Sequence, residues 1–513
     1  MGVVLLKRKL TSFQIIILGF SGVILFGTFL LMLPFSSRSG LATPFSDALF
    51  TSTSAVCVTG LIIHDTATYW STFGQFVILL LIQIGGMGVI TIAASFAMIS
   101  GRKISLMQRC TMQEAISAPK VGGIVRLTGF IVRVTLVMEL LCAAVMAPVF
   151  CRDFGKKGLW MALFHSVSAF CNAGFDLLGV RTPFSSLTSY AANPVINFTI
   201  MFLIVFGGIG FLTWDDIRTN RLHLHKYRMQ SKVILCTTAV LLIVPAMYFY
   251  FFEFADLTRK ERLLSSLFQA VTPRTAGFNT VELTDLSEAG QFITIALMLI
   301  GGSPGSTAGG LKTTTIAVLL TTAISTFRRR ENANLFGRRI DDDVVKNAAT
   351  ISLMYITLCC TGGLIISVSE GLPMLTCLFE TASAVGTVGL SLGITPELNL
   401  LSRSVLILLM FFGRVGGLTL IFAALSSAQK KVSKLPKEKI TVGERRHYEI
   451  NSSNWSGAIW KAYCPALKSF GPSSDGGRYF GGTCRGCSAP CYQCTDWRQY
   501  ECRFLGISRC SQL

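Results

Sequence analysis

Four glycines occupy matching positions in four similar segments of the chain, which read VCVTGL, FCNAGF, PRTAGF and VGTVGL. An extended segment can turn its main-chain carbonyl oxygens toward one axis when glycine supplies the unusual backbone conformations at low cost. Rings of such oxygens replace the hydration shell of a monovalent cation. The sequence therefore predicts main-chain ion ligands at Val58, Thr59 and Gly60, at Asn172, Ala173 and Gly174, at Thr275, Ala276 and Gly277, and at Thr387, Val388 and Gly389.

Repetition distinguishes these segments from ordinary glycines that end helices. Each segment follows a short amphipathic run with the dipeptide Leu-Phe, and the copies recur at intervals of roughly 104 to 114 residues. One copy alone is a weak signal, because a glycine after a helix is common. Four copies in register favour four similar units around one axis, as degenerate forms of the threonine, valine and glycine pattern of potassium-channel filters.

The Leu-Phe runs predict short helices near residues 44–56, 158–170, 262–272 and 372–385. Each is too short to cross a bilayer, for which about 20 residues are needed. We therefore expect half-helices that enter the membrane surrounded by protein, because free backbone groups cannot face lipid. The negative dipole ends at their C-termini would point toward the centre and favour a cation.

Composition indicates a membrane protein. Hydrophobic residues make up 51% of the 513 residues and charged residues only 14%, and the mean hydropathy is +0.57. Eight apolar stretches approach or exceed the length of a span: 12–34, 71–99, 127–150, 194–213, 232–252, 291–323, 347–369 and 403–426. The predicted fold is an all-α polytopic membrane protein with four pseudosymmetric repeats of helix, pore loop and helix around one central pore.

The net charge of +19 follows the predicted topology. Basic clusters after the second, fourth, sixth and eighth apolar stretches begin at Arg102, Arg218, Arg328 and Lys430, whereas the alternate connections have fewer basic residues. By the positive-inside rule, both ends of the eight-span region are cytoplasmic. No basic stretch is interleaved with stacking aromatic residues, so nucleic acid is not an expected partner.

A second glycine pattern marks the later helix of three repeats: GGMGVIT at 85–91, GGIGFLT at 207–213 and GRVGGLT at 413–419. Arg414 stands where the other copies have their second glycine. A charge within a span is costly unless it faces water or a partner. Arg414 is therefore interpreted either as a barrier facing the ion pathway or as a side chain that extends to the cytoplasmic surface.

The third repeat has an irregular stretch at residues 301–312 instead. Its five glycines and one proline exclude a regular helix, and such a loop is tolerated at membrane depth only where it lines a cavity. A flexible gate, a passive kink and a phosphate-binding loop are the alternatives. The last is disfavoured because no nucleotide-binding strand precedes the lysine.

Residues 10 to 445 resemble the Ktr/Trk/HKT superfamily of potassium transporters, most closely the membrane subunit of bacterial Ktr systems. The likeness includes all four repeats, VTPRTAGFNT at 271–280 and GGSPGSTAGGLKTTT at 301–315. Trk-type subunits usually have two more helices before the first repeat, and this chain enters its first repeat almost at once. The resemblance implies potassium, because Gly60 stands where sodium-transporting plant relatives have serine.

The resemblance also implies an intramembrane gate made of Arg414 with Gly301, Gly302, Ser303, Gly305, Ser306, Thr307, Gly309, Gly310 and Lys312. It implies a homodimer controlled by a cytoplasmic nucleotide-binding regulatory ring (KtrA/TrkA-like), no cofactor bound by this chain, and sodium as a candidate activator. The expected function is potassium uptake across the bacterial plasma membrane, with a cytoplasmic N-terminus. The alternative is a Trk-type potassium/proton or sodium-coupled cation transporter.

The predicted repeats cover residues 1–115, 116–228, 229–340 and 341–445, with the gating loop 301–312 in the third. After residue 446 the chain becomes rich in cysteine, and Cys484, Cys487, Cys491 and Cys494 have paired thiolate spacing. The gap between the two pairs is short for a zinc module. Residues 446–513 are interpreted as a poorly ordered extension unrelated to transport, and a membrane redox or metalloprotein built around this tail is the alternative.

Other residues have more modest roles. No acid–base pair, nucleophile constellation or nucleotide motif indicates an enzyme, and a sodium-coupled solute symporter would show two inverted repeats. Arg274 is expected to brace pore-loop carbonyls, and His165 to pack behind the second half-helix. Asp65, Asp176 and Asn279 follow their segments closely, either to concentrate cations at the outer mouth or as solvated loop residues.

Overall fold

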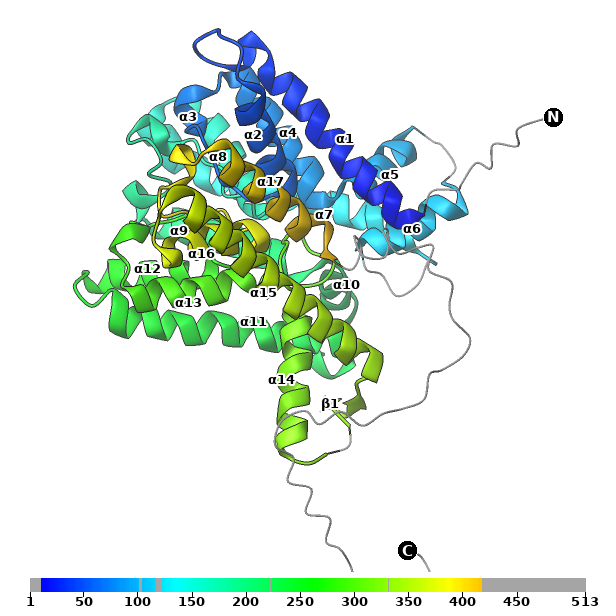
Figure 1. The fold of residues 1–513 in the computed structure, drawn as a ribbon. Helices are drawn as coiled ribbons and strands as arrows, with labels where there is room; N and C mark the ends of the chain where they lie inside the picture. Colours follow the sequence, from blue (N-terminus) through cyan, green and yellow to red (C-terminus); the bar gives the residue numbers. More distant parts are fainter. Residues whose placement is uncertain (1–10, 101–103, 117–121, 222, 331, 418–513) are drawn as a thin grey trace, which may run out of the picture. The chain divides into compact units, whose positions relative to one another are not determined.

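The computed structural model describes residues 11–417 apart from 101–103, 117–121, 222 and 331, and this part is almost entirely helical (Figure 1). Within it, a short hairpin pairs β1 (Asn334–Leu335) with β2 (Arg338–Arg339). The predicted extension 446–513 and the end of the last predicted span lie outside the described residues.

Four helices have the length and apolar character of membrane spans. They are α1 (Ser12–Met32), α7 (Ile124–Phe154), α11 (Met229–Tyr248, continued by a π-helical turn at Phe249–Glu253) and α15 (Asp342–Glu370). They correspond to the predicted spans at 12–34, 127–150, 232–252 and 347–369. Only 33% of the most apolar window of each is buried, which leaves a large apolar surface for lipid.

Four short helices occupy the predicted half-helix positions: α2 (Phe45–Cys57), α8 (Lys157–Phe170), α12 (Arg259–Val271) and α16 (Met374–Gly386). Proline precedes α2 and α16, at Pro44 and Pro373, where its fixed φ and missing N–H suit a helix start. The phenylalanine of every Leu-Phe pair is 0% exposed, at Phe50, Phe164, Phe268 and Phe379. The later turns of the half-helices are therefore enclosed by protein.

The later helix is interrupted in the first three repeats. α4 (Thr72–Met87) and α5 (Val89–Ile99) are bent by 97°, and α9 (Pro194–Ile209) and α10 (Phe211–Asn220) by 95°. α13 (Glu288–Leu299) and α14 (Thr313–Phe327) are separated by residues 300–312, and α17 (Leu400–Val415) ends at Gly416. The prediction of single apolar spans at 71–99 and 194–213 was wrong in this respect. Gly88 and Gly210 have φ of 86° and 100°, which cannot continue a right-handed helix.

Shorter elements connect these helices. They are α3 (Thr66–Tyr69), α6 (Leu106–Ile116) and single 3₁₀ turns at Pro34–Ser36, Leu178–Val180, Thr188–Tyr190, Leu224–Lys226, Leu283–Asp285 and Thr395–Glu397. Asp65 caps α3, because its Oδ1 accepts the N–H groups of Ala67 (3.0 Å) and Thr68 (2.8 Å). This cap fixes the chain shortly after the first glycine segment.

Glycines allow the interrupted helices to touch the half-helices. A Cβ atom at the first glycine of each cluster would overlap a carbonyl oxygen near the end of the half-helix in the same repeat: Gly85 on Val56, Gly207 on Phe170 and Gly413 on Val385. The same contact occurs in three repeats. The C-terminal ends of α2, α8 and α16 are thereby held by main-chain packing that any larger residue would disturb.

The connection from α7 to α8 is similarly close. Gly155, with φ of 59°, ends α7, and Gly158 begins the first turn of α8. A Cβ atom at Gly158 would overlap main-chain atoms of Phe150 and Cys151. The return of the chain into the second half-helix therefore depends on the absence of a side chain at Gly158.

We expect Gly158→Ala to lower the free energy of unfolding by about 1–3 kcal/mol, because the methyl group must displace backbone of α7. Gly129→Ala is the matched control, since Gly129 also lies in a helix of this hairpin and an added Cβ meets nothing within 4 Å. That control should be neutral or stabilising by about 0.5–1 kcal/mol. Thermal unfolding in detergent measures both, and equal stability of the two variants would contradict the packing described.

Candidate functional site

The four glycine segments have one backbone conformation. Two residues before each glycine, φ is positive in all four: Val58 57°, Asn172 59°, Thr275 70° and Thr387 52°. The glycines are also positive: Gly60 91°, Gly174 69°, Gly277 78° and Gly389 93°. Positive φ is uncommon for a residue other than glycine and is a genuine outlier for β-branched valine and threonine. Its recurrence at one position of four segments indicates a constraint shared by all of them.

The four glycines form a closed cycle of contacts. A Cβ atom at each glycine would overlap or crowd the carbonyl oxygen that precedes the next glycine: Gly60 meets Ala173, Gly174 meets Ala276, Gly277 meets Val388, and Gly389 meets Thr59. The cycle returns to its start, so the structure brings all four predicted segments together. Main-chain oxygens and Cα atoms, without side chains, make up these contacts.

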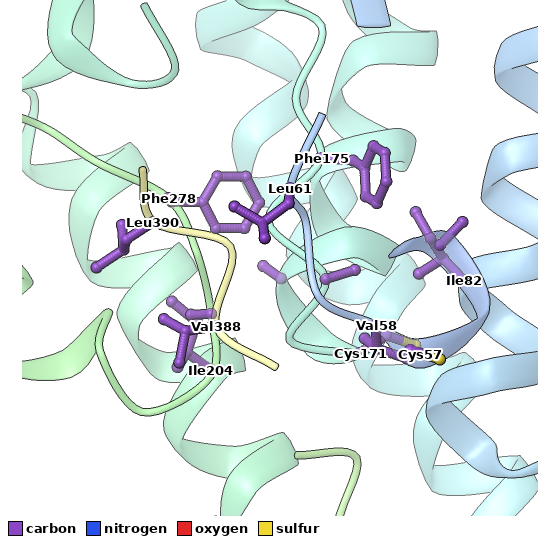
Figure 2. Close-up of a cluster of buried hydrophobic side chains, with 14 of the residues drawn as sticks. Cys57, Val58, Leu61, Ile82, Cys171, Phe175, Ile204, Phe278, Val388 and Leu390 are labelled. Atoms are coloured by element: carbon purple, nitrogen blue, oxygen red, sulfur yellow. The ribbon is translucent and has the colours of Figure 1, made fainter. Parts of the chain in front are cut away.

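The residue after each glycine anchors its segment. Leu61, Phe175, Phe278 and Leu390 are all apolar and at most 1% exposed. Figure 2 shows them at one end of a buried hydrophobic cluster that has Cys57, Val58 and Cys171 at its other end. These side chains pack within the buried cluster and hold the segments in place, so that the main chains of the segments meet one another.

Hydroxyl groups at the ends of the half-helices hold the segments in a way that the sequence analysis missed. Ser54 and Ser383 accept the N–H groups of Gly60 (3.0 Å) and Gly389 (2.9 Å) through Oγ. Ser168 and Thr272 instead donate to the carbonyl oxygens of Phe175 (2.7 Å) and Phe278 (2.5 Å). A serine six residues before the glycine in three of the four segments is the signal that would have found them.

The loop of residues 300–312 lies against the second repeat. The N–H of Ser303 donates to the carbonyl of Gly208 (3.0 Å), that of Thr307 to Gly207 (3.3 Å), and Phe211 N–H donates to the carbonyl of Gly305 (2.7 Å). The Thr307 hydroxyl donates to the carbonyl of Phe170, at the end of α8 (3.1 Å). These bonds seat the loop on the break between α9 and α10.

Two further contacts place the loop next to the glycine segments. A Cβ atom at Gly309 would overlap the side chain of Thr387, and one at Gly310 would lie 3.0 Å from the carbonyl oxygen of Gly386. Lys312 turns back on the loop, and its Nζ donates to the carbonyls of Ala308 (2.8 Å) and Gly309 (3.2 Å). Ser303 Oγ and Thr313 Oγ1 pair at 3.1 Å.

Arg414 connects three repeats. Its guanidinium group, in the last turn of α17, donates to the carbonyls of Thr307 in the loop, of Gly85 and of Gly86 in α4, the last at 3.0 Å. All three acceptors are main-chain oxygens of the loop and of α4. The side chain thus turns toward the loop and α4, and its role as a barrier in an ion pathway stays a prediction.

The remaining predicted residues lie around the segments. Arg274 is 5% exposed, donates through Nη2 to Thr238 Oγ1 (3.3 Å), and its carbonyl accepts Asn172 Nδ2 (3.3 Å). Asn279 bonds the carbonyl of Val281 (3.1 Å). Arg274 therefore links two segments through its main chain, while its side chain extends to α11.

Asp176 lies in the loop after α8, outside the helices, where it accepts the N–H of Leu178 (2.9 Å). Burial raises the pKa of the Asp176 carboxyl to about 7, and the nearby Asp65 carboxyl adds to the rise, against hydrogen bonds from Leu178 and Gly179 that lower it. Asp65 itself is tied to α3 and to the N–H of Phe184 (3.1 Å). The charge of Asp176 therefore changes near neutral pH.

Comparisons with known proteins agree with the resemblance found in the sequence. Residues 7–435 match the family model TrkH, described as a cation transport protein. The chain is 42% identical over 449 residues to the potassium/sodium uptake protein NtpJ of Enterococcus hirae, covering 85% of this chain and 98% of that one. It is 37% identical over 431 residues to the Ktr system potassium uptake protein B of Bacillus subtilis, covering 83% and 95%.

The fold is also that of a solved transporter. The crystal structure of the potassium transporter TrkH from Vibrio parahaemolyticus matches with a TM-score of 0.64 and 20% identity, covering 81% of this chain and 86% of that one. At this identity the match concerns the fold alone. The family model and the relatives place the protein among transporters and not enzymes. The chain belongs to the TrkH family of cation transport proteins.

Proposed function

We propose that this protein takes up potassium through a pore that the four repeats surround, with the closed cycle of Gly60, Gly174, Gly277 and Gly389 as its selectivity filter. The cycle is the observation that carries the proposal, because it aligns the main-chain oxygens of four segments at one place without a side chain between them. Such oxygens suit a dehydrated monovalent cation. The membrane potential drives a cation inward at about 2.3 kcal/mol per 100 mV.

Potassium is the proposed main ion and sodium a second one. The relatives of 42% and 37% identity are named a potassium/sodium uptake protein and a potassium uptake protein. Gly60 supports potassium, because it places no side chain at the narrow contact with the carbonyl oxygen of Ala173. Sodium would act as an activator or as a coupled ion at a separate place.

Residues 301–312 and Arg414 form the proposed gate, and the bonds described above belong to its closed state. Arg414 holds Thr307 and α4 together, and a fixed positive charge there opposes a passing cation. Opening requires these bonds to part and the loop to leave the segments. Glycine backbone freedom in the loop makes two arrangements accessible at modest cost.

Regulation is proposed to come from a cytoplasmic nucleotide-binding ring that docks on a homodimer of this chain in the bacterial plasma membrane, with the N-terminus inside. Relatives are named as parts of Ktr systems. Arg328, Arg329 and Arg330 are exposed at the end of α14 and continue toward Arg338 and Arg339 of the hairpin. This basic surface suits an acidic partner.

Complementation of a bacterium that lacks potassium uptake, with and without a regulatory subunit, tests the transport proposal. We expect growth at low potassium with the unaltered chain and loss of at least about tenfold in rubidium uptake with Gly389→Ala, because the methyl group would displace the carbonyl of Thr59. Gly371→Ala is the control, since Gly371 also has positive φ (68°) but open space around it. Growth by Gly389→Ala equal to that by Gly371→Ala would contradict the filter assignment.

Removal of the Arg414 side chain should open the gate. In proteoliposomes without a regulatory subunit, Arg414→Ala should raise the maximal rate of rubidium flux at least several-fold, because it removes the three charge-assisted hydrogen bonds that hold the loop to Arg414 and α4. Deletion within residues 303–310 should act in the same direction. Lys346→Ala removes an exposed positive charge on α15 and should leave the rate unchanged. A rate unchanged by both gate variants would rule out the gate.

Protonation of Asp176 should weaken ion capture. Since its pKa is about 7, the carboxyl is mostly charged at external pH 8 and mostly neutral at pH 6, so the apparent KM for potassium should rise about two- to fivefold as pH falls between these values. Asp176→Asn should have the high KM at both pH values. The exposed Asp256→Asn is the charge-matched control, and a pH dependence that survives in Asp176→Asn would contradict this assignment.

A further inference from the structure

One position of each half-helix is polar and buried in all four repeats. It directly follows the Leu-Phe dipeptide and holds Thr51, His165, Gln269 and Glu380, which are 2%, 0%, 1% and 0% exposed. A buried polar side chain costs stability unless it is hydrogen-bonded. The hydrogen-bond partners of these four side chains differ between the repeats.

Glu380 connects α16 to the residues that follow Gly389. Its carboxyl accepts hydrogen bonds from the hydroxyl of Ser391, the N–H of Leu392 (3.2 Å) and the hydroxyl of Thr395 (3.0 Å). All three donors lie within six residues after Gly389. In the part of the chain that the structure describes, no ion pair involves Glu380, so these bonds alone satisfy the carboxyl.

His165 makes the corresponding connection in the second repeat. Its Nδ1 lies 2.7 Å from the carbonyl of Met161 and therefore carries the proton, and Nε2 accepts the N–H of Leu177 at 3.4 Å. Leu177 and Leu392 are both the third residue after their glycine. The ring also stacks on Phe278, the residue after the third glycine, with centroids 6.3 Å apart.

The first and third repeats lack this connection. The Thr51 hydroxyl donates to the carbonyl of Asp47 within its own helix (2.9 Å). Among the described residues, Gln269 Nε2 and the hydroxyl of Thr280, the third residue after Gly277, have no hydrogen-bond partner. The contact cycle runs through Gly60, Gly174, Gly277 and Gly389 in order, so the two connected repeats, the second and fourth, lie opposite each other.

We propose that Glu380 and His165 are positioning residues for ion selection. They hold the outer ends of the second and fourth segments and so fix the width of the oxygen ring across one diagonal. Sodium, the smaller ion, needs oxygens closer than potassium does, and a segment released at its outer end can move inward to meet it. This inference rests on the proposed transport function and names the residues that determine its specificity.

The test measures rubidium and sodium uptake by the purified full chain in proteoliposomes. Glu380→Gln keeps the shape of the side chain but replaces one acceptor oxygen with a donor, and we expect the rubidium-to-sodium uptake ratio to fall about tenfold. Ser391→Ala combined with Thr395→Val removes donors from the other side and should lower the ratio similarly. Because both changes break the same connection, the variant that combines all three substitutions should have an uptake ratio no lower than that of either change alone.

Thr51→Val is the matched control, since it removes the polar group at the same position of a repeat without the connection, and its ratio should equal that of the unaltered chain. His165→Gln should lower the ratio as Glu380→Gln does. A ratio unchanged in Glu380→Gln protein that is monodisperse and conducts rubidium would overturn the positioning role. A ratio lowered as much by Thr51→Val would overturn it too, and absence of rubidium uptake by the unaltered chain would overturn both proposals.

Discussion

A cation that leaves water needs oxygen atoms on all sides at once, and in this protein the close approach of four main chains is the constraint from which the rest follows. Each of Gly60, Gly174, Gly277 and Gly389 faces the carbonyl that precedes the next glycine. No other residue type fits these contacts. The half-helices exist to deliver the four main chains to this place, and the buried Leu-Phe phenylalanines hold the half-helices inside a protein shell that replaces lipid.

The four repeats become less alike with distance from the ring of glycine segments. The glycine segments are alike in backbone conformation in all four repeats. Outside them, hydrogen bonds that Glu380 and His165 accept distinguish the fourth and second repeats from the other two. The third repeat alone has the loop 300–312, and the fourth repeat alone has Arg414. In the proposed function, an ion-selective ring calls for equivalent repeats, whereas control of access needs only one element that can move.

Much of this arrangement was predictable from periodicity. Four glycines in register after Leu-Phe runs predict enclosed half-helices, and the glycine-rich composition of 301–312 predicts an irregular segment. The 95° and 97° bends at Gly210 and Gly88 were not predicted, because a glycine cluster within an apolar stretch is compatible with a continuous helix. The folded chain shows that the first glycine of a cluster packs on the half-helix, as Gly207 does on Phe170, and that the positive φ of Gly210 makes the turn.

Side-chain partners were the least predictable part. Ser54 and Ser168 stand at the same position of their segments, yet one accepts from a glycine N–H and the other donates to a carbonyl. Polar residues after Leu-Phe are visible in the sequence, but whether they reach the chain that follows the glycine of the same repeat depends on distances that only the folded chain sets. The sequence could not predict that the acceptors of Arg414 are main-chain oxygens of the loop and of α4.

The position of bound ions tests the central claim most directly. Crystals of the protein grown in rubidium salt should show anomalous scattering from rubidium at the centre of the cycle formed by Gly60, Gly174, Gly277 and Gly389, surrounded by main-chain oxygens of all four segments. Rubidium found only elsewhere, or coordinated there by fewer than the four segments, would contradict a potassium filter built from this ring.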